Sequence, residues 1–579
     1  MKFRTNMTIP VFLTAILLTA CDQQQLENGV DGADLVFTNG RVYTVDAKRS
    51  WAQAVAIDDG KIVYVGDDAG AQDFVTSNTQ LVDLHGKMLL PGFQDVHTHF
   101  AASGVHYLEC PVFDLENKEA VLAEIKKCSD ENPNAEIIRG VGWTIDQFEN
   151  GRPPRKELLD AIDSSRPLVF GDADGHAFWV NTVAFETYGI TRDTADPKGG
   201  RIERDPQTGE LWGTLHEDSA MELLKSQWPR YTDEDFIEGI RYSENHYHSL
   251  GITAVQDALV KLDGRSEYRS LPAYKTLSDR GELNIRVSVS LFWEAEKGIE
   301  QIQRFKNVRR EMSADRLRAN TVKFWADGVV ETHTAMMLEP YSDKPETRGL
   351  MMVPREQLMT GVPLLDAEGF QIHIHAIGDA TVRYSLDAIE GAWQANGRRD
   401  ARHHITHAQI VHPDDIPRFQ ALGVGASFQP YWTYADDYVT LFNLPRVGPD
   451  RIKWSYPIGS LQRSGATVAF SSDWFVSTAN PLVGIETAVT HVDPLTNEGQ
   501  PYLPSETIAL DEAVAAYTIN AAYLNAIDDM TGSIQVGKYA DLIVLDQDLF
   551  QIPIQDVSDV QVLLTLLEGD VMYGDIEDL

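Results

Sequence analysis

The sequence predicts an α/β protein with a (β/α)8 TIM barrel, a small β-sandwich domain formed by both chain ends, and an inserted subdomain after the first barrel strand. Eight short β-rich runs end in polar residues, and most of the segments between them can form a helix. Alternating strands and helices are typical of parallel βα units, and eight such units can close a barrel. The runs are residues 89–99, 252–257, 285–292, 321–328, 370–376, 404–408, 425–430 and 467–473.

The first run carries two histidines at its end. Residues 89–99 read as one buried strand that opens at Pro91-Gly92 and ends in His97-Thr98-His99. Residues i and i+2 of a strand point the same way, so two imidazoles lie side by side. Neutral imidazole is the commonest protein ligand for zinc and similar metals. The alternative is that His97 and His99 are two ordinary polar residues at a strand end. Matching residues on later strands favour a metal site over this alternative.

Both ends of the chain are rich in short strands. Residues 34–88 contain the hairpin signals Asn39-Gly40 and Asp59-Gly60, and residues 531–579 show similar runs. Neither end has enough strands for a stable sandwich, so we expect one β-domain built from both. The barrel then occupies 89–530. Additional β-rich runs after its first strand place the inserted subdomain at 103–250.

The N-terminus has the pattern of an export signal. Lys2 and Arg4 precede an apolar run at 8–18 that is too short to span a bilayer. The run ends in Leu-Thr-Ala-Cys21, which resembles a bacterial lipobox. This resemblance implies a lipoprotein signal peptide at 1–20, lipidation of Cys21, a polar tether at 21–33 and a lipid-anchored protein of the bacterial cell envelope that faces the periplasm or the exterior. A plain cleaved signal or a tethering helix is the alternative.

The composition excludes one class of partner. The formal charge of the 579-residue chain is −38, with 43% hydrophobic and 23% charged residues. Such an acidic surface argues against nucleic acid, whose phosphates select lysine and arginine. We expect a small-molecule substrate and contact with the membrane through the lipid anchor alone. A homodimer is one assembly that the chain could form.

Two further cysteines follow Cys21. Cys110 and Cys128 are close enough in sequence to form a disulfide in an exported protein. Two buried free thiols are the alternative.

Several strand ends carry residues that suit a metal. Side chains at the carboxyl ends of barrel strands meet in one site. Histidines with a carboxylate favour a catalytic metal centre over a structural zinc site, which prefers thiolates. The candidate ligands are His97, His99, Lys323, His375, His407 and Asp473.

Lys323 is unusual among these candidates. A cationic ammonium cannot ligate a metal, but a buried lysine shifts toward the neutral amine. A neutral amine can add CO2 to become a carbamate, whose carboxylate could bridge two ions. An ordinary ion pair between Lys323 and Asp327 is the alternative.

These residues and the motifs around them closely resemble the amidohydrolase superfamily, nearest to its family 3 with the N-substituted formamide deformylase-like proteins. The motifs are Pro91-Gly92-Phe93 through His99, Val322-Lys323-Phe-Trp-Ala-Asp327-Gly328, His375-Ala-Ile-Gly378-Asp379, Thr406-His407-Ala-Gln409, Ser472-Asp473-Trp474 and Gly537-Lys538-Tyr-Ala540-Asp541. The resemblance covers residues 34–575.

The resemblance implies a metal-dependent hydrolase that cleaves an amide or other non-peptide C–N bond. It also implies a divalent metal, zinc as one or two ions, at the candidate ligands, with Asp473 as the catalytic proton carrier. Trp143 and His176 would line the substrate pocket, although a packed tryptophan and a surface histidine would look alike in sequence. An esterase, lactonase or isomerase on the same centre is an alternative, as is a non-catalytic lipoprotein that binds metal or a solute.

Three residues depart from the family pattern. Thr406 stands where relatives often carry glutamate, and His373 is an additional inward-facing histidine. His333 occupies a loop where small residues or arginine are common, and we place it in the substrate pocket. These changes remove none of the candidate metal ligands, but they leave the identity of the substrate undetermined.

Overall fold

The computed structural model describes residues 32–113, 115–148, 152–173, 175–197, 200–228, 231–263 and 267–579. The expected signal peptide, Cys21 and nearly all of the tether lie outside these ranges. Within them, no helix combines the length and apolar character needed to cross a membrane.

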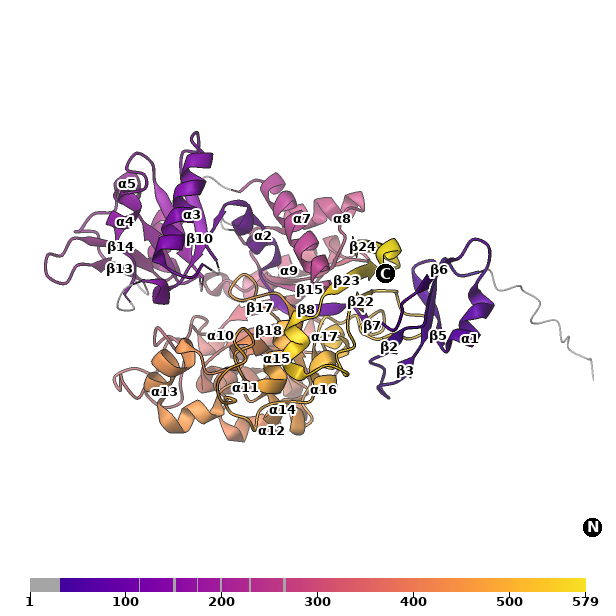
Figure 1. Ribbon diagram of the computed structural model, residues 1–579. Helices are drawn as coiled ribbons and strands as arrows, with labels where there is room; N and C mark the ends of the chain where they lie inside the picture. Colours follow the sequence, from indigo (N-terminus) through magenta and orange to yellow (C-terminus); the bar gives the residue numbers. More distant parts are fainter. Residues whose placement is uncertain are drawn as a thin grey trace, which may run out of the picture.

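Eight parallel strands form the centre of the molecule (Figure 1). They follow one another around the sheet in chain order, as predicted. The ring closes just beyond the last strand, where the backbone N–H of Asp473 donates to the His97 carbonyl at 2.8 Å and that of His99 donates to the Trp474 carbonyl at 2.8 Å. The predicted barrel is therefore confirmed. Its strands are β8 (Phe93–Thr98), β15 (Ile252–Val260), β16 (Arg286–Phe292), β17 (Leu317–Trp325), β18 (Gln371–Ala376), β19 (His404–His407), β20 (Gly425–Phe428) and β21 (Val468–Phe470).

Helices alternate with these strands. Two of them end at a glycine in the left-handed region, Gly281 with φ 67° and Gly423 with φ 64°, where a side chain would be strained. Each glycine turns the chain back toward the next barrel strand. The alternating helices are α7 (Asp233–Ser249), α8 (Leu271–Arg280), α9 (Ile302–Glu311), α10 (Arg355–Ala367), α11 (Asp379–Asn396), α12 (Ile416–Leu422) and α14 (Ile458–Arg463).

Strands from both chain ends build the β-domain. A four-stranded sheet is formed by β5, β4, β1 and β6, and a six-stranded sheet by β24, β23, β22, β7, β2 and β3. Phe37, Leu89 and Val544, from the two ends of the chain, share one buried core. The bounds are β1 (Leu35–Thr38), β2 (Arg41–Tyr43), β3 (Trp51–Ala52), β4 (Ala54–Asp58), β5 (Lys61–Gly66), β6 (Gln80–Asp83), β7 (Met88–Pro91), β22 (Leu542–Leu545), β23 (Val562–Leu567) and β24 (Asp570–Gly574).

The expected single strand at 89–99 is two strands. β7 pairs with β2 and β22 in the β-domain, whereas β8 pairs with β15 in the barrel. The break falls at Gly92, where a Cβ atom would meet the Thr253 hydroxyl at 2.4 Å. The interpretation as one strand was wrong because the two halves follow each other directly as buried, extended runs, and a sequence pattern does not show a change of sheet.

A buried ion pair connects the barrel with the C-terminal strands. Arg286 on β16 donates through Nε to Asp541 Oδ2 at 2.7 Å and lies 2.8 Å from Glu568. Both Arg286 and Asp541 are buried, and breaking such a pair costs about 3–5 kcal/mol because one charge is left unpaired. The β-domain therefore holds one side of the barrel in place.

The insert forms a separate sheet next to the barrel mouth (Figure 1). The flanking helices α2 (Phe100–Leu108) and α7 cross so closely that a Cβ on Gly104 would meet the Gly239 carbonyl at 1.9 Å. Both helices pack into the barrel core, so the insert is shorter than the expected 103–250. Its strands are β9 (Cys110–Pro111), β10 (Ile138–Trp143), β11 (Leu168–Asp172), β12 (Ala177–Val180), β13 (Arg201–Arg204) and β14 (Leu211–His216).

A disulfide joins Cys110 on β9 to Cys128 on α3 (Lys118–Glu131). Closing a loop of this length stabilises a fold by about 3 kcal/mol, mainly by restricting the unfolded chain. We expect the denatured, unreduced protein to show no alkylation at either cysteine by peptide mass analysis. Reduction of the denatured protein before alkylation serves as the control and should expose both thiols. Two alkylated thiols without reduction would contradict the bond.

Candidate metal centre

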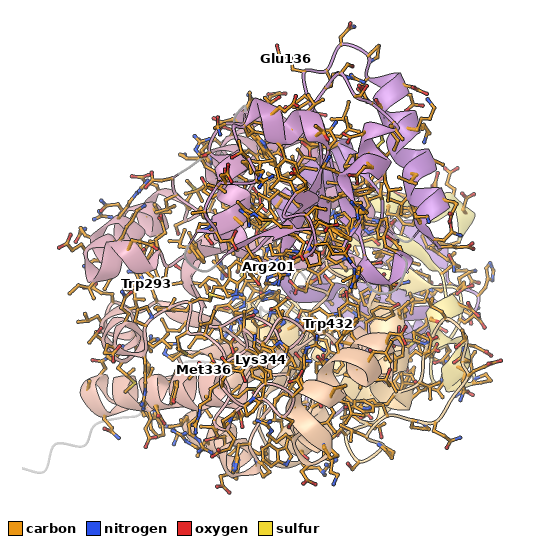
Figure 2. All side chains as sticks on the ribbon, turned by 90° about the vertical axis from the view of Figure 1, so that its left-hand side faces the viewer. Glu136, Arg201, Trp293, Met336, Lys344 and Trp432 are labelled. Atoms are coloured by element: carbon orange, nitrogen blue, oxygen red, sulfur yellow. A yellow bond between two sulfur atoms is a disulfide. The ribbon has the colours of Figure 1, made fainter. Side chains whose placement is uncertain are left out.

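One cavity of about 340 Å³ lies at the carboxyl ends of the barrel strands. Its floor includes His97, Lys323 and Asp473, and its wall includes Thr144 and His176 from the insert. The insert carries Glu136 at the top of Figure 2, and Trp432, another lining residue, lies in the barrel part below it. The cavity is large enough for a small molecule and is bounded by both parts of the chain.

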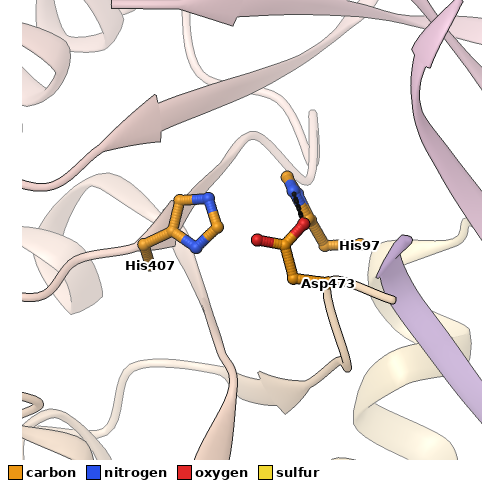
Figure 3. A group of neighbouring side chains, drawn as sticks. All are labelled: His97, His407 and Asp473. Atoms are coloured by element: carbon orange, nitrogen blue, oxygen red, sulfur yellow. Dashed lines mark ion pairs between the residues drawn. The ribbon is translucent and has the colours of Figure 1, made fainter. Parts of the chain in front are cut away.

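Three side chains at the floor converge on one point (Figure 3). His97, His407 and Asp473 each present a ligand atom, and these atoms lie within 4.8 Å of one another. Asp473 Oδ1 is 3.2 Å from His97 Nε2 and 3.3 Å from His99 Nε2. Strands β8, β19 and β21 place these four residues together because parallel barrel strands end on the same face.

The contacts of Asp473 fit a cation between the side chains. Its Oδ1 is buried and accepts no hydrogen bond from any described residue, although two imidazole nitrogens lie 3.2 and 3.3 Å from it. A buried carboxylate oxygen without a donor is costly, and coordination of a metal removes that cost. The donor set of imidazoles and one carboxylate suits zinc.

The protonation states agree with this fit. Burial lowers the pKa of His97 and His375 well below the ordinary value, and that of His407 to about 3. Burial by itself raises the pKa of Asp473, but the imidazoles of His97, His99 and His407 outweigh it and hold the pKa well below its usual range. Neutral imidazoles and an ionised carboxylate are the forms that bind metals.

Polar groups lie behind two of the histidines, and one of them orients its ring. His407 Nδ1 lies 2.7 Å from Gln429 Oε1, an acceptor for the ring N–H, which directs Nε2 into the cavity. His375 Nδ1 lies 3.4 Å from Asp327 Oδ1. Asp327 is itself fixed by backbone N–H groups of Met336, Ile377 and Gly378 at 2.9–3.0 Å. The backbone therefore determines where the Asp327 carboxylate points.

Lys323 does not pair with Asp327. Its Nζ lies 3.4 Å from both His97 Nδ1 and His373 Nε2, and these two ring nitrogens are 2.7 Å apart. Burial lowers the pKa of Lys323 to about 7. The alternative of an ordinary Lys323–Asp327 ion pair is wrong, because backbone amides and His375 surround Asp327.

The structure brings most of the predicted site residues together. All six candidate ligands and the predicted pocket residue His176 line the cavity. His176 lies 3.1 Å from Glu217 through Nδ1, which fixes its ring. The seven residues are His97, His99, Lys323, His375, His407, Asp473 and His176.

Two predicted pocket residues lie elsewhere, so their assignment to the pocket was wrong. Trp143 is buried in the core of the insert and donates its ring N–H to the Phe170 carbonyl at 2.9 Å. His333 turns toward Asp343, 3.0 Å from its Nε2, and is not among the cavity residues. Thr144, next to Trp143, and Glu331, near His333, line the cavity instead.

Sequence reasoning also missed several residues. Gln429 follows the seventh barrel strand and could have been found by the rule that metal-bound histidines need an outer partner. Glu331, Asp436 and Asn443 line the cavity from loops and an irregular helix, for which no periodic pattern exists. Their positions depend on how those loops fold over the barrel.

The barrel and its buried histidines and aspartate define a metal centre of the hydrolytic kind. Comparison with known proteins agrees. Residues 80–573 match the Amidohydrolase family. The chain is 31% identical over 545 residues to the protein LONG AFTER FAR-RED 3 of Arabidopsis thaliana, covering 93% of this chain and 92% of that protein. It is 28% identical over 548 residues to the N-substituted formamide deformylase of Arthrobacter pascens, covering 93% and 98%.

A solved structure supports the same assignment. An uncharacterized metal-dependent hydrolase from Pyrococcus furiosus superposes with a TM-score of 0.69 at 26% identity, covering 89% of this chain and 99% of that one. The chain belongs to the amidohydrolase family, and it is a metal-dependent hydrolase. The family predicted from the sequence motifs is confirmed.

Proposed function

We propose that the protein cleaves an amide or other non-peptide C–N bond of a small molecule. The observation that carries this proposal is the convergence of His97 and His99 on one buried oxygen of Asp473. The formamide deformylase relative supports the choice of bond, because that protein is named for removing a formyl group from a substituted nitrogen.

The proposed ligands are His97, His99, Lys323, His375, His407 and Asp473, with zinc as one or two ions. When bound, the metal would lower the pKa of water and polarise the scissile carbonyl. Asp473 accepts the proton of the attacking water and delivers it to the departing nitrogen, which is otherwise a poor leaving group. His176, held by Glu217, faces the cavity from the insert and borders the bound substrate.

A panel of chromogenic compounds tests the choice of bond. Formamides, longer N-acyl amines, cyclic amides, esters and lactones are supplied to the protein with and without added zinc. We expect zinc-dependent release of amine from at least one amide class, with a kcat/KM above that of the matched ester. Turnover of esters or lactones alone would contradict C–N cleavage. No metal-dependent turnover of any compound, together with tight metal binding, would favour a binding protein.

The cellular location is a separate proposal, based on residues 18–21. We propose a lipid anchor at Cys21 that holds the enzyme in the bacterial envelope. Cys21→Ser should release the protein from the membrane fraction or leave the precursor unprocessed, as fractionation and mass measurement would show. Asn78→Ser serves as a control, because it introduces a serine at an exposed position far from the signal. Unchanged processing and membrane association of Cys21→Ser would contradict the anchor.

A further inference from the structure

We infer that the cavity binds a substrate whose substituent carries a protonated amine, at a subsite formed by Glu331, Asp436 and Asn443. This inference rests on the proposed hydrolase function and adds the substrate class. All three residues line the same cavity as the metal centre. Their side chains supply acceptor oxygens and two negative charges.

The charges in the cavity favour a cation. Among the described residues that line it, Lys323 is the sole lysine or arginine, and it lies at the floor against His97 and His373. Both carboxylates act on one neighbouring group, the Tyr456 phenol. Burial first, and then the charges of Glu331 and Asp436, raise the pKa of the Tyr456 phenol well above its ordinary value. A substrate with a negative substituent would meet repulsion there, and a cation would be attracted.

Asn443 provides independent support. The residue is 2% exposed, and its side-chain Oδ1 has no hydrogen-bond partner among the described residues. A buried amide oxygen without a donor costs about 1–3 kcal/mol. An ammonium group carries three N–H donors and can donate to such an oxygen, and its positive charge is attracted by the carboxylates that line the same cavity.

The local backbone holds these groups in place. Tyr438–Asn443 forms a π-helix, a form that is rare and often occurs at functional sites. Asp436 fixes its start by accepting the backbone N–H of Val439 at 2.8 Å. Asp436 and Asn443 therefore lie on one short segment of the chain, before its first helical residue and at its last.

Aromatic rings line the same cavity. Trp432 stacks on the His407 ring with centroids 5.6 Å apart and planes at 16°, which connects the metal centre to the segment that carries Asp436. Tyr431, Trp325 and Phe475 also line the cavity. Aromatic faces attract cations and contact the apolar body of a substrate.

Two inert probes test the subsite without any hydrolysis. Calorimetry at neutral pH compares 4-phenylbutylamine, which is protonated, with 4-phenylbutanol on the metal-loaded protein. We expect the amine to bind at least about tenfold more tightly, equivalent to about 1.4 kcal/mol. Equal binding, or tighter binding of the alcohol, would overturn the inference.

Variants locate the preference within the cavity. Asp436→Asn, which keeps an oxygen for the Val439 N–H, should lower the amine preference several-fold, and Glu331→Gln should do the same. Asp437→Asn is the matched control, because Asp437 is exposed, adjacent in sequence and not a cavity residue. Asn443→Leu should weaken both probes, since both donate to its oxygen. If the amine preference falls as much in Asp437→Asn as in Asp436→Asn, the preference comes from the overall negative charge of the region. That result would overturn the subsite.

The two proposals can fail separately. Neither probe has a bond that the enzyme could hydrolyse, so the binding preference does not depend on turnover. Zinc-dependent amide cleavage without an amine preference would overturn the subsite alone. An amine preference without cleavage of any amide would leave the subsite in place and overturn the proposed reaction.

Discussion

Replacing Asp473 by asparagine should leave the fold and most of the bound metal in place and lower turnover by about 10² to 10⁴. Asparagine has nearly the same size and offers an oxygen to the metal, but it cannot take up a proton near neutral pH. The native carboxylate has a pKa well below its ordinary value, with His97, His99 and His407 opposing the effect of burial. It is therefore ionised throughout the neutral range, the state in which a carboxylate has room for a proton.

Measurements of metal content and kcat show whether Asp473 carries a proton or serves only as a metal ligand. Plasma emission spectrometry measures bound zinc, and steady-state kinetics measure kcat with the best amide from the panel. Asp437→Asn provides the matched control, because it removes an exposed carboxylate and should change neither quantity. If Asp473→Asn loses metal and activity in proportion, and excess zinc restores both, the residue is a ligand alone.

Replacing Lys323 by alanine should remove metal and reduce turnover by at least about a hundredfold, the upper end of the effect seen for outer partners of metal ligands. Lys323 is 2% exposed and lies 3.4 Å from His97 Nδ1, where burial lowers its pKa to about 7. A neutral amine at that position can add CO2, and the resulting carbamate would supply a carboxylate to the centre. Native mass spectrometry of the wild-type protein should show the mass of one added CO2.

Short carboxylates extend this test. Acetate supplied with zinc should restore part of the activity of Lys323→Ala, because it can occupy the space of the missing carbamate. Lys453→Ala controls for the loss of a lysine, since Lys453 is largely exposed and pairs with Asp450. An unmodified Lys323 in a protein with full metal occupancy would contradict the carbamate and indicate a centre without it.

The barrel was predictable because its signals are local and repeated. Each strand is a short apolar run with a polar end, so the order of strands and the place of His97, Lys323 and Asp473 followed from the sequence. The break at Gly92 did not follow, because β7 and β8 are both buried and extended and differ in the sheets they join. That difference is set by contacts with residues far along the chain.

The pocket wall was less predictable than the floor. Trp143 and Thr144 are neighbours, yet the first packs inside the insert and the second faces the cavity. His333 and Glu331 lie two residues apart, yet His333 turns to Asp343 and Glu331 lines the cavity. Which side of a loop faces a pocket depends on tertiary packing, and neither composition nor periodicity carries that information.

Titration of metal-stripped protein with zinc tests the central claim most directly. Chelator-treated protein is titrated while bound zinc and the rate of formamide hydrolysis are measured on the same samples. A hydrolytic metal centre predicts negligible turnover in the stripped protein and a rate that rises with bound zinc until the site is full. Full turnover after the zinc has been removed would contradict it.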